Sequence, residues 1–252
     1  MKITRRQYRI KKRIISVFMI LCIIGIIYSL YNIYIWKKNV DKNNEIKEIT
    51  KKHVKEEKKS EKDEVKEYKI DFDALKKSNS DTVGYIKVNN TNIDYVVVQT
   101  KDNSYYLNHN FNKEKNRAGW IFLDYRNKLD GSDKNTIIYG HNMKDGSMFE
   151  TLSNVLQKWW YEDSNNYIVT FTTEEKTFMY QVFSTYDIKN EDYYIKTKFN
   201  SDNDYEKFLK TIKSRSNHDY GIELTKDDTI LTLSSCLGAG EKRVVLHAKK
   251  VN

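Results

Sequence analysis

The chain has 252 residues, a formal net charge of +9, two cysteines and no proline. This length suffices for one sizeable domain with additional segments. The charge is unevenly distributed: residues 2–13 carry seven Lys or Arg, residues 37–67 carry eleven Lys and nine Asp or Glu, and residues 68–252 carry 26 of each sign. The C-terminal part therefore lacks the basic excess that nucleic-acid binding requires, and we expect no nucleic-acid partner.

The N-terminal segment predicts a membrane anchor. Residues 1–13 form a basic head, and residues 14–36 form an apolar run without a charged side chain. As a helix at 1.5 Å per residue the run would be about 34 Å long, enough to cross a bilayer. The basic head predicts a cytoplasmic N-terminus, with the rest of the chain outside the cell. The alternative is a cleaved signal peptide, but the run is long for a signal core and no small-x-small cleavage pattern follows it.

Residues 37–67 predict a stalk. They are dense in Lys and Glu and contain no glycine, so we expect a solvated charged helix or disorder without chemistry of its own.

Residues 68–252 predict a mostly-β domain. Eight stretches have the composition of strands: 84–88, 93–99, 118–124, 135–140, 167–171, 176–183, 228–236 and 243–249. Asp71 begins a short capped helix, residues 148–160 are expected to be helical, and residues 203–214 form an amphipathic helix. The expected buried faces are Leu152, Val155, Leu156 and Trp159 in the second helix, and Tyr205, Phe208, Leu209 and Ile212 in the third. Many short strands with a few inserted helices favour a barrel or a sandwich.

A cysteine at the end of a strand is the candidate nucleophile. Cys236 ends the stretch Thr232-Leu233-Ser234-Ser235-Cys236, Arg243 follows on the next strand, and His141 follows the strand at 135–140. An imidazolium or guanidinium nearby favours the reactive thiolate, and attack on an amide carbonyl creates an oxyanion that needs a donor. Cys22 lies in the apolar run, so the outer domain holds one thiol and no disulfide. No cysteine or histidine pair has zinc-site spacing, and neither a metal nor a cofactor is expected.

Each of these residues also has an alternative interpretation. A lone strand cysteine is most often a core residue. His141 could cap a loop, and Arg243 could pair with Asp228 or Glu241 at the surface. His247 has the same strand parity as Arg243 and is a rival for the imidazole. The other histidines, His53, His109 and His218, lie in the stalk or in polar loops.

Taken together, the motifs resemble the sortases, the cell-wall transpeptidases of Gram-positive bacteria. Thr232–Cys236 followed by Arg243 is similar to their signature Thr-Leu-x-Thr-Cys with an arginine shortly after, although Ser235 replaces the usual threonine. The segment 137–143 resembles the one that carries the sortase histidine, and the segments 118–127 and 146–152 resemble class B. The resemblance covers residues 68–252. It implies a sortase-type closed β-barrel with several short helices and a helix between late strands, behind an N-terminal transmembrane helix.

The resemblance also implies a mechanism. Cys236 would attack a threonine carbonyl in a C-terminal sorting motif of a secreted protein, and an amine of a peptidoglycan precursor would resolve the thioacyl-enzyme. His141 would be general acid and then general base, and Arg243 would hold the oxyanion and the substrate backbone. Ser234 would be a substrate contact. Activity should then depend on pH as a bell-shaped curve.

Three other functions remain open on the sequence. A pilin-polymerising sortase would use a lysine of another pilin subunit as acceptor, but residues 68–83 contain no lid motif of the kind such enzymes commonly carry. A thiol peptidase would release the peptide to water. A non-catalytic wall-binding module on a membrane tether would need no nucleophile.

Overall fold

The computed structural model describes residues 5–58, 66–189, 191–237 and 242–251. The chain divides into two compact units, Met1–Asp41 and Lys42–Asn252. The long helix α1 (Arg5–Lys51) belongs to the first unit up to Asp41 and to the second from Lys42 onwards.

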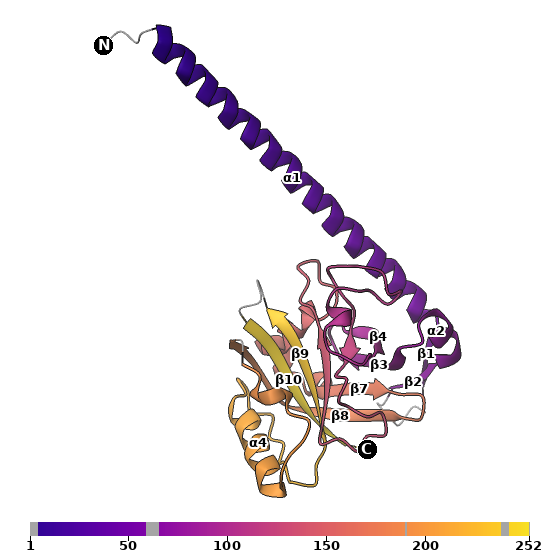
Figure 1. The fold of residues 1–252 in the computed structure, drawn as a ribbon. Coiled ribbons are helices and arrows are strands. Elements are labelled where there is room, and N and C mark those ends of the chain that lie inside the picture. The colour runs from indigo at the N-terminus through magenta and orange to yellow at the C-terminus, as the bar shows by residue number, and fades with distance from the viewer. Residues whose placement is uncertain (1–4, 59–65, 190, 238–241, 252) are drawn as a thin grey trace. The chain divides into compact units, whose positions relative to one another are not determined.

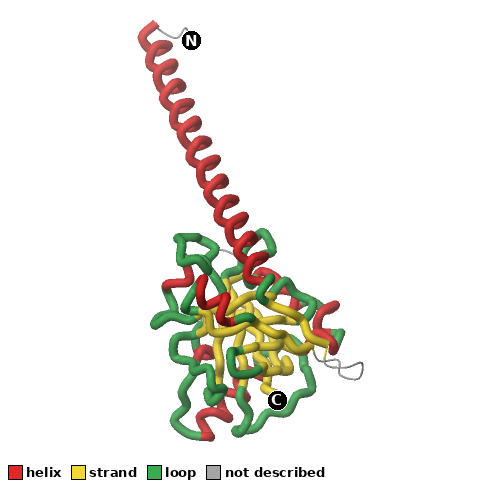
Figure 2. The backbone as a smooth tube through the Cα atoms, turned by 90° about the vertical axis from the view of Figure 1, so that its right-hand side faces the viewer, coloured by secondary structure: helices red, strands yellow, loops and turns green. Residues whose placement is uncertain are grey.

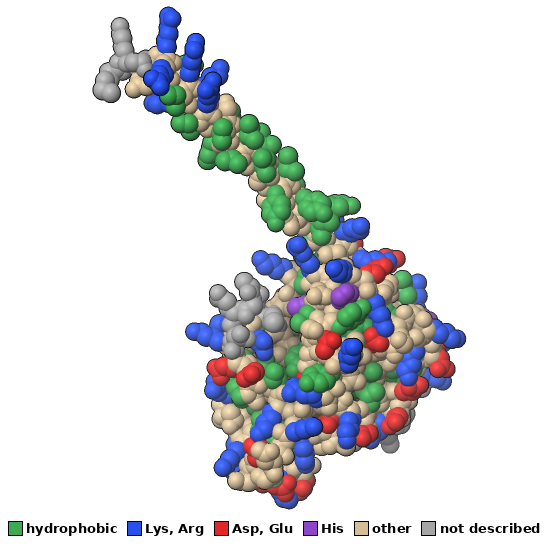
Figure 3. All heavy atoms as spheres, in the orientation of Figure 1, with side chains coloured by type: hydrophobic (Ala, Val, Ile, Leu, Met, Phe, Trp, Pro, Cys, Tyr) green, Lys and Arg blue, Asp and Glu red, His purple; other side chains and the backbone are tan. Residues whose placement is uncertain are grey.

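The first unit consists of the greater part of α1. Its apolar side chains from Ile14 to Trp36 are exposed in the protein alone, and Figure 3 shows them as a band along the helix that follows a group of Lys and Arg. By length and composition this helix is a candidate membrane span. An apolar helix of more than 20 residues is long enough to cross the hydrocarbon core of a bilayer.

The last turns of α1 differ from the solvated stalk that we expected. Asn43, Ile46 and Thr50 are 1%, 1% and 3% exposed, and Ile46 belongs to the main core of the second unit. These three residues lie on one helix face because they are three and four positions apart. The abundant charges around them obscured this short stripe in the sequence.

A hairpin and a short helix follow α1. β1 (Val54–Lys58) pairs antiparallel with β2 (Lys66–Ile70). α2 (Phe72–Ser78) begins as predicted at Asp71, whose carboxylate accepts a hydrogen bond from the Ala74 amide at 3.0 Å. This N-cap satisfies one of the free amides at the helix start.

Eight strands then form a closed barrel (Figure 1). They are β3 (Thr82–Val88), β4 (Asp94–Val98), β5 (Phe122–Leu123), β6 (Asn135–Gly140), β7 (Ile168–Thr172), β8 (Thr177–Lys189), β9 (Ile230–Leu237) and β10 (Lys242–Lys250). Their order around the barrel is β10-β8-β7-β3-β4-β5-β6-β9, and β9 pairs with β10 to close it. The pairs β4–β5 and β6–β9 are parallel, whereas the others are antiparallel. The predicted closed barrel is confirmed.

Short helices and loops surround the strands (Figure 2). The helices are η1 (Tyr105–Leu107), η2 (Glu150–Leu156), α3 (Lys158–Tyr161), η3 (Ser164–Tyr167), η4 (Tyr193–Ile195) and α4 (Asp202–Ser214). α4 lies between β8 and β9 in the chain, and its predicted face of Tyr205, Phe208, Leu209 and Ile212 is buried, so the inserted helix is confirmed.

Two predicted elements are corrected. The stretch 148–160 is not one helix, because Gln157 has extended backbone angles and separates η2 from α3. In consequence Trp160 is buried, while Trp159, which we expected on the buried face, is 56% exposed. The strand expected at 118–124 is reduced to β5, and Gly119, with a φ of +58°, lies outside the β region of backbone angles.

Side chains alternate between the two faces of β9 and β10 and contribute to two hydrophobic cores. Leu231 and Leu233 belong to the main core, which also holds Trp120 and Phe149. Ile230 and Val245 belong to a second core that includes the buried face of α4. Because β9 is covered on both faces, its hydroxyl-bearing residues are buried and need hydrogen-bond partners.

Candidate active site

Three neighbouring strands bring the predicted site residues to one end of the barrel. β6 pairs with β9 up to Gly140 and Ser235, and β9 pairs with β10 at Cys236 and Arg243. His141 directly follows Gly140, so continuing the parallel register by one residue places its backbone beside that of Cys236. Adjacent strands lie about 4.8 Å apart. The backbones of His141, Cys236 and Arg243 are therefore consecutive across three strands. The side chain of Cys236 lies outside the described part of the structure.

The His141 ring is held by a backbone carbonyl. Its Nε2 lies 2.7 Å from the Leu107 carbonyl oxygen at the end of η1. A carbonyl oxygen only accepts hydrogen bonds, so Nε2 carries the proton of the neutral ring and Nδ1 is its basic nitrogen. The His141 carbonyl accepts a hydrogen bond from the Phe149 amide at 2.8 Å, which fixes the loop that follows.

Arg243 and Ser234 meet at Tyr194, a residue of η4. The Arg243 Nη1 donates to the Tyr194 hydroxyl at 3.4 Å, and the same hydroxyl is 2.8 Å from the Ser234 Oγ. Arg243 is half-buried, whereas Ser234 is only 4% exposed. The alternative partner Asp228 forms an ion pair with Lys249 at 3.1 Å instead. The other alternative partner, Glu241, lies outside the described residues.

The rival imidazole, His247, is sealed within the fold. It is 0% exposed, and it lies 2.8 Å from the Thr232 hydroxyl through Nδ1 and 2.9 Å from the Tyr186 hydroxyl through Nε2. Thr232 donates its own proton to Asn135, so Nδ1 of His247 must be the donor and Nε2 the acceptor. Burial lowers the pKa of His247 to about 3, which keeps the ring neutral.

The other histidines do not reach the site. His53 lies 3.9 Å from the Asp71 carboxylate, His109 stacks on Tyr105, and His218 stacks on Tyr161. Of the five histidines, His141 alone follows the end of a strand that neighbours β9.

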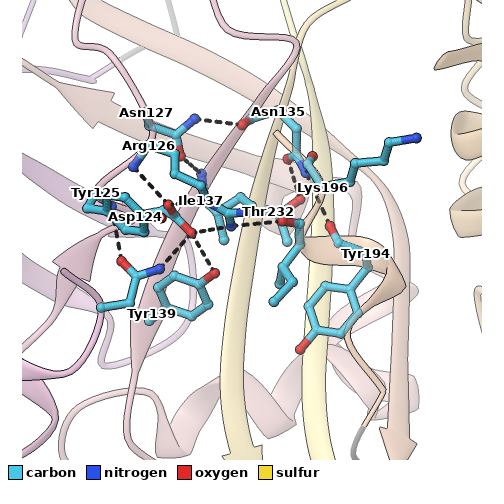
Figure 4. Close-up of polar contacts among 12 residues, drawn as sticks. Asp124, Tyr125, Arg126, Asn127, Asn135, Ile137, Tyr139, Tyr194, Lys196 and Thr232 are labelled. Carbon is cyan, nitrogen blue, oxygen red and sulfur yellow. Dashed lines mark hydrogen bonds and ion pairs between the residues drawn. The ribbon is translucent and has the colours of Figure 1, made fainter. Parts of the chain in front are cut away.

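A buried carboxylate organises the side of the site next to β6 (Figure 4). The Asp124 side chain is fully buried and accepts hydrogen bonds from the Tyr139 hydroxyl at 2.8 Å and from Arg126 Nη2 at 2.6 Å. Burial alone would raise the pKa of Asp124, but the Arg126 hydrogen bonds outweigh it and the pKa lies below its usual value. Burial and the nearby Asp124 charge raise the pKa of Tyr139, so its hydroxyl stays protonated and donates to Asp124.

Two further contacts attach η4 to the barrel. Arg126 Nη2 also donates to the Ile195 carbonyl at 2.9 Å. On β6, the Asn135 amide group donates to the carbonyls of Tyr194 at 3.2 Å and Lys196 at 3.0 Å, as Figure 4 shows. Since η4 supplies the Tyr194 hydroxyl, these contacts hold Tyr194 beside Arg243 and Ser234.

Sequence reasoning did not identify Tyr194, Asp124 or the Leu107 carbonyl. The pair Tyr193-Tyr194 in a polar stretch after a long strand was the available signal for Tyr194. Asp124 lies in the segment 118–127 that we had singled out, but nothing in the sequence showed that its carboxylate would be buried. The contribution of Leu107 is a backbone atom and leaves no trace in the sequence.

Comparison with known proteins places the chain within one family. The family model described as "Sortase domain" matches residues 86–251. Sortase B of Listeria monocytogenes is 44% identical over 167 residues, which are 64% of this chain. The match spans 65% of the length of that relative.

Solved structures agree in fold and in class. Sortase B from B. anthracis is similar with a TM-score of 0.74 and 35% identity, over 85% of this chain and 99% of the other. The structure of a Staphylococcus aureus sortase B–substrate complex is similar with a TM-score of 0.67 and 40% identity, over 72% of this chain and 84% of the other.

Proposed function

Because the chain belongs to the sortase family and its relatives are sortases of class B, we propose that it is a membrane-anchored cysteine transpeptidase that joins secreted proteins to the cell wall. Cys236 is the nucleophile, His141 the general acid and base, and Arg243 the cation that stabilises the oxyanion. The observation that carries the proposal is the adjacency of β6, β9 and β10: His141 follows the end of β6, Cys236 lies near the end of β9, and Arg243 lies near the start of β10.

In the first half-reaction the Cys236 thiolate attacks the carbonyl carbon of a threonine in the sorting motif. The C–N bond breaks, and the protonated His141 ring gives its Nδ1 proton to the leaving amine. A thioester between Cys236 and the threonine remains. Nδ1 suits this step because the Leu107 carbonyl already occupies Nε2–H.

In the second half-reaction an amine attacks the thioester carbon. His141 Nδ1, now neutral, takes a proton from the amine, the C–S bond breaks, and the Cys236 thiolate is restored. A new amide bond joins the threonine to the acceptor. Both halves pass through a tetrahedral oxyanion, which a fixed guanidinium stabilises without reorganisation at the moment of reaction.

Arg243 suits the oxyanion because its side chain is already oriented. Its Nη1 donates to the Tyr194 hydroxyl at 3.4 Å, and the planar fork of a guanidinium matches the geometry of an oxyanion better than a point charge does. Ser234 is the assigned substrate contact, although its hydroxyl pairs with Tyr194 in this state. Because a hydroxyl has one donor and two acceptor positions, a peptide group can bind Ser234 beside Tyr194 or in its place.

The partners follow from the same reaction. The substrate is the C-terminal sorting peptide of a secreted protein, in keeping with the S. aureus substrate complex, and the acceptor is an amine of a peptidoglycan precursor. The apolar run of α1 anchors the enzyme in the membrane, with the basic head in the cytoplasm and the barrel outside. The proposed divisions of the chain are the head (1–13), the anchor (14–36), the stalk (37–67) and the catalytic domain (68–252), with residues 42–51 of the stalk lying within the second unit.

Product analysis tests the proposal. The full-length protein in detergent is incubated with a library of Thr-containing peptides, with and without an amine acceptor, beside the Cys236→Ala variant. We expect cleavage after threonine and an acceptor-dependent amide product from the wild type alone. Hydrolysis that ignores the acceptor would favour a thiol peptidase, and transfer only to a lysine of a pilin subunit would favour the pilin-polymerising function. Wall anchoring that survives Cys236→Ala in cells would overturn the enzymatic function.

A further inference from the structure

The last turns of α1 lie within the second unit and contact two segments that pack on His141 or on the end of the loop that follows it. Asn43 and Lys47, one helical turn apart, each make a hydrogen bond to a backbone carbonyl of the barrel domain. The Asn43 contact leads to the His141 ring, and the Lys47 contact leads through Tyr95 to the His141 carbonyl.

The first path begins at Asn43, which is 1% exposed. Its Nδ2 donates to the Gly119 carbonyl at 3.0 Å, and its Oδ1 accepts from the Asn116 Nδ2 at 2.7 Å. Both halves of the amide are therefore engaged by one turn, residues 116–119. A buried amide with both ends paired has one orientation, so the helix fixes the position of the Gly119 peptide.

Gly119 is in direct contact with the catalytic imidazole. At its φ of +58°, an added Cβ would lie 2.3 Å from the Tyr106 carbonyl oxygen, 3.0 Å from the Leu107 carbonyl oxygen and 3.1 Å from His141 Cδ2. The Gly119 backbone thus packs against the His141 ring and against the carbonyl that holds it. A shift of Gly119 would move both partners of the Nε2–H hydrogen bond.

The second path begins at Lys47. Its Nζ donates to the Asn92 carbonyl at 2.9 Å and lies 3.9 Å from the centroid of the Tyr95 ring. The Tyr95 hydroxyl accepts the Met148 amide at 2.9 Å, next to the Phe149 amide that binds the His141 carbonyl. Lys47 therefore supports, through Tyr95, the end of the loop that begins at His141, at Met148 and Phe149.

We propose that Asn43 is a positioning residue for His141, with Lys47 as its auxiliary. The inference rests on the proposed function, in which His141 Nδ1 exchanges a proton with substrate. The helix α1 thus carries the candidate membrane span and, in its last turns, the two residues that we propose to position the general acid. A misplacement of about 1 Å at a catalytic group can cost on the order of a hundredfold in rate. Loss of the Asn43 amide should loosen the position of His141 only in part, so we expect kcat to fall about tenfold.

Two variants of Asn43 and a matched control test this. Asn43→Ala removes both hydrogen bonds, and Asn43→Asp keeps the acceptor for Asn116 but cannot donate to Gly119. Asn44→Ala is the control, because it removes the same side chain from an exposed position one residue on. With full-length protein, sorting peptide and amine acceptor, we expect kcat to fall about tenfold in both Asn43 variants, with KM within twofold of wild type and no change in Asn44→Ala.

A second readout does not depend on turnover. In protein labelled with ¹⁵N at histidine, with the signal assigned by its loss in His141→Ala, we expect the wild-type neutral ring to be protonated at Nε2 only. Asn43→Ala should shift the ring signals towards a mixture of tautomers, while Asn44→Ala should not. If the wild type fails to transfer any peptide, the proposed function fails but this readout still tests the positioning.

The inference is overturned if both Asn43 variants match Asn44→Ala in kcat and in the His141 signals. It is equally overturned if they raise KM with kcat unchanged, because that pattern belongs to a peptide-binding role. Thermal unfolding of each variant establishes that the measurements are made on folded protein.

Discussion

His141 and His247 carry the same side chain but differ in exposure and in hydrogen-bond partners. His141 lies at a strand end, half-exposed, and donates from Nε2 to the Leu107 carbonyl. His247 lies mid-strand in the second core, fully buried, and donates from Nδ1 to Thr232 while accepting from Tyr186 at Nε2. One ring keeps a basic nitrogen accessible, whereas the other has both nitrogens engaged. Burial and hydrogen-bond partners, rather than residue type, separate a candidate catalyst from a structural residue.

The largest expected effect is on activity when the strand-end histidine is removed. His141→Ala should lower kcat/KM by about 10²–10⁴-fold, because it removes the proposed proton donor and acceptor of both half-reactions. Its melting temperature should change little, since the ring makes one hydrogen bond at the surface. Steady-state transfer assays and thermal unfolding measure the two effects, with His218→Ala as the matched control. Comparable losses in both variants would remove the distinction between His141 and the other histidines.

A smaller loss is expected when an ammonium group replaces the guanidinium of Arg243. Arg243→Lys should lower kcat/KM by roughly a hundredfold, because an ammonium cannot hold both Tyr194 and an oxyanion with a planar fork. Arg9→Lys, at an exposed arginine of the basic head, is the control and should transfer peptide at the wild-type rate. Near-normal turnover by Arg243→Lys would contradict the role assigned to Arg243.

Replacing His247 should change the stability of the fold and the pH dependence of that stability rather than the chemical step. Because the folded-state pKa of His247 is about 3, below the ordinary value of 6.5, the unfolded chain binds the proton first. Stability should therefore be unaffected by this group above pH 6.5 and should fall as the pH drops towards 3, by up to about 5 kcal/mol.

His247→Gln tests that expectation. Its stability at pH 7 should be lower than that of the wild type, because the hydrogen bonds to Thr232 and Tyr186 are disturbed, but the decline between pH 6.5 and pH 4 should be shallower. Urea unfolding at several pH values measures both slopes. Parallel curves for the two proteins would show that another group causes the acid sensitivity.

The smallest expected effect concerns the Tyr194 hydroxyl, which links η4 to Ser234 on β9 and to Arg243 on β10. Tyr194→Phe removes the hydroxyl shared by Arg243 and Ser234 but keeps the packing of the ring, so we expect a change of only severalfold, in KM more than in kcat. Tyr193→Phe is the matched control, since the Tyr193 hydroxyl contacts Tyr186 rather than Arg243. A loss in Tyr194→Phe as large as that in Arg243→Lys would mean that the hydroxyl itself acts on the substrate.

The sequence predicted elements well where the pattern was local and failed where a distant contact decided. α4 follows from apolar residues at helical spacing, which lie within one segment. The region 148–160 has similar spacing, yet the extended backbone of Gln157 splits it and turns Trp160 rather than Trp159 inwards. In the charged turns at 42–51 only Asn43, Ile46 and Thr50 are buried, and the composition of the segment is dominated by the charged residues around them.

By itself the sequence determined the mostly-β domain and its apolar N-terminal helix, and its resemblance to the sortases predicted the closed barrel and the three residues proposed for catalysis, because periodicity, charge distribution and the motifs at 137–143 and 232–243 are properties of short segments. Only the tertiary structure showed that the rival His247 is buried, brought Asp124, Arg126 and Tyr194 beside the site, and joined Asn43 to the Gly119 turn. These relations depend on which strands become neighbours when the barrel closes. That choice is made by the packing of residues far apart in the chain, and no local pattern records it.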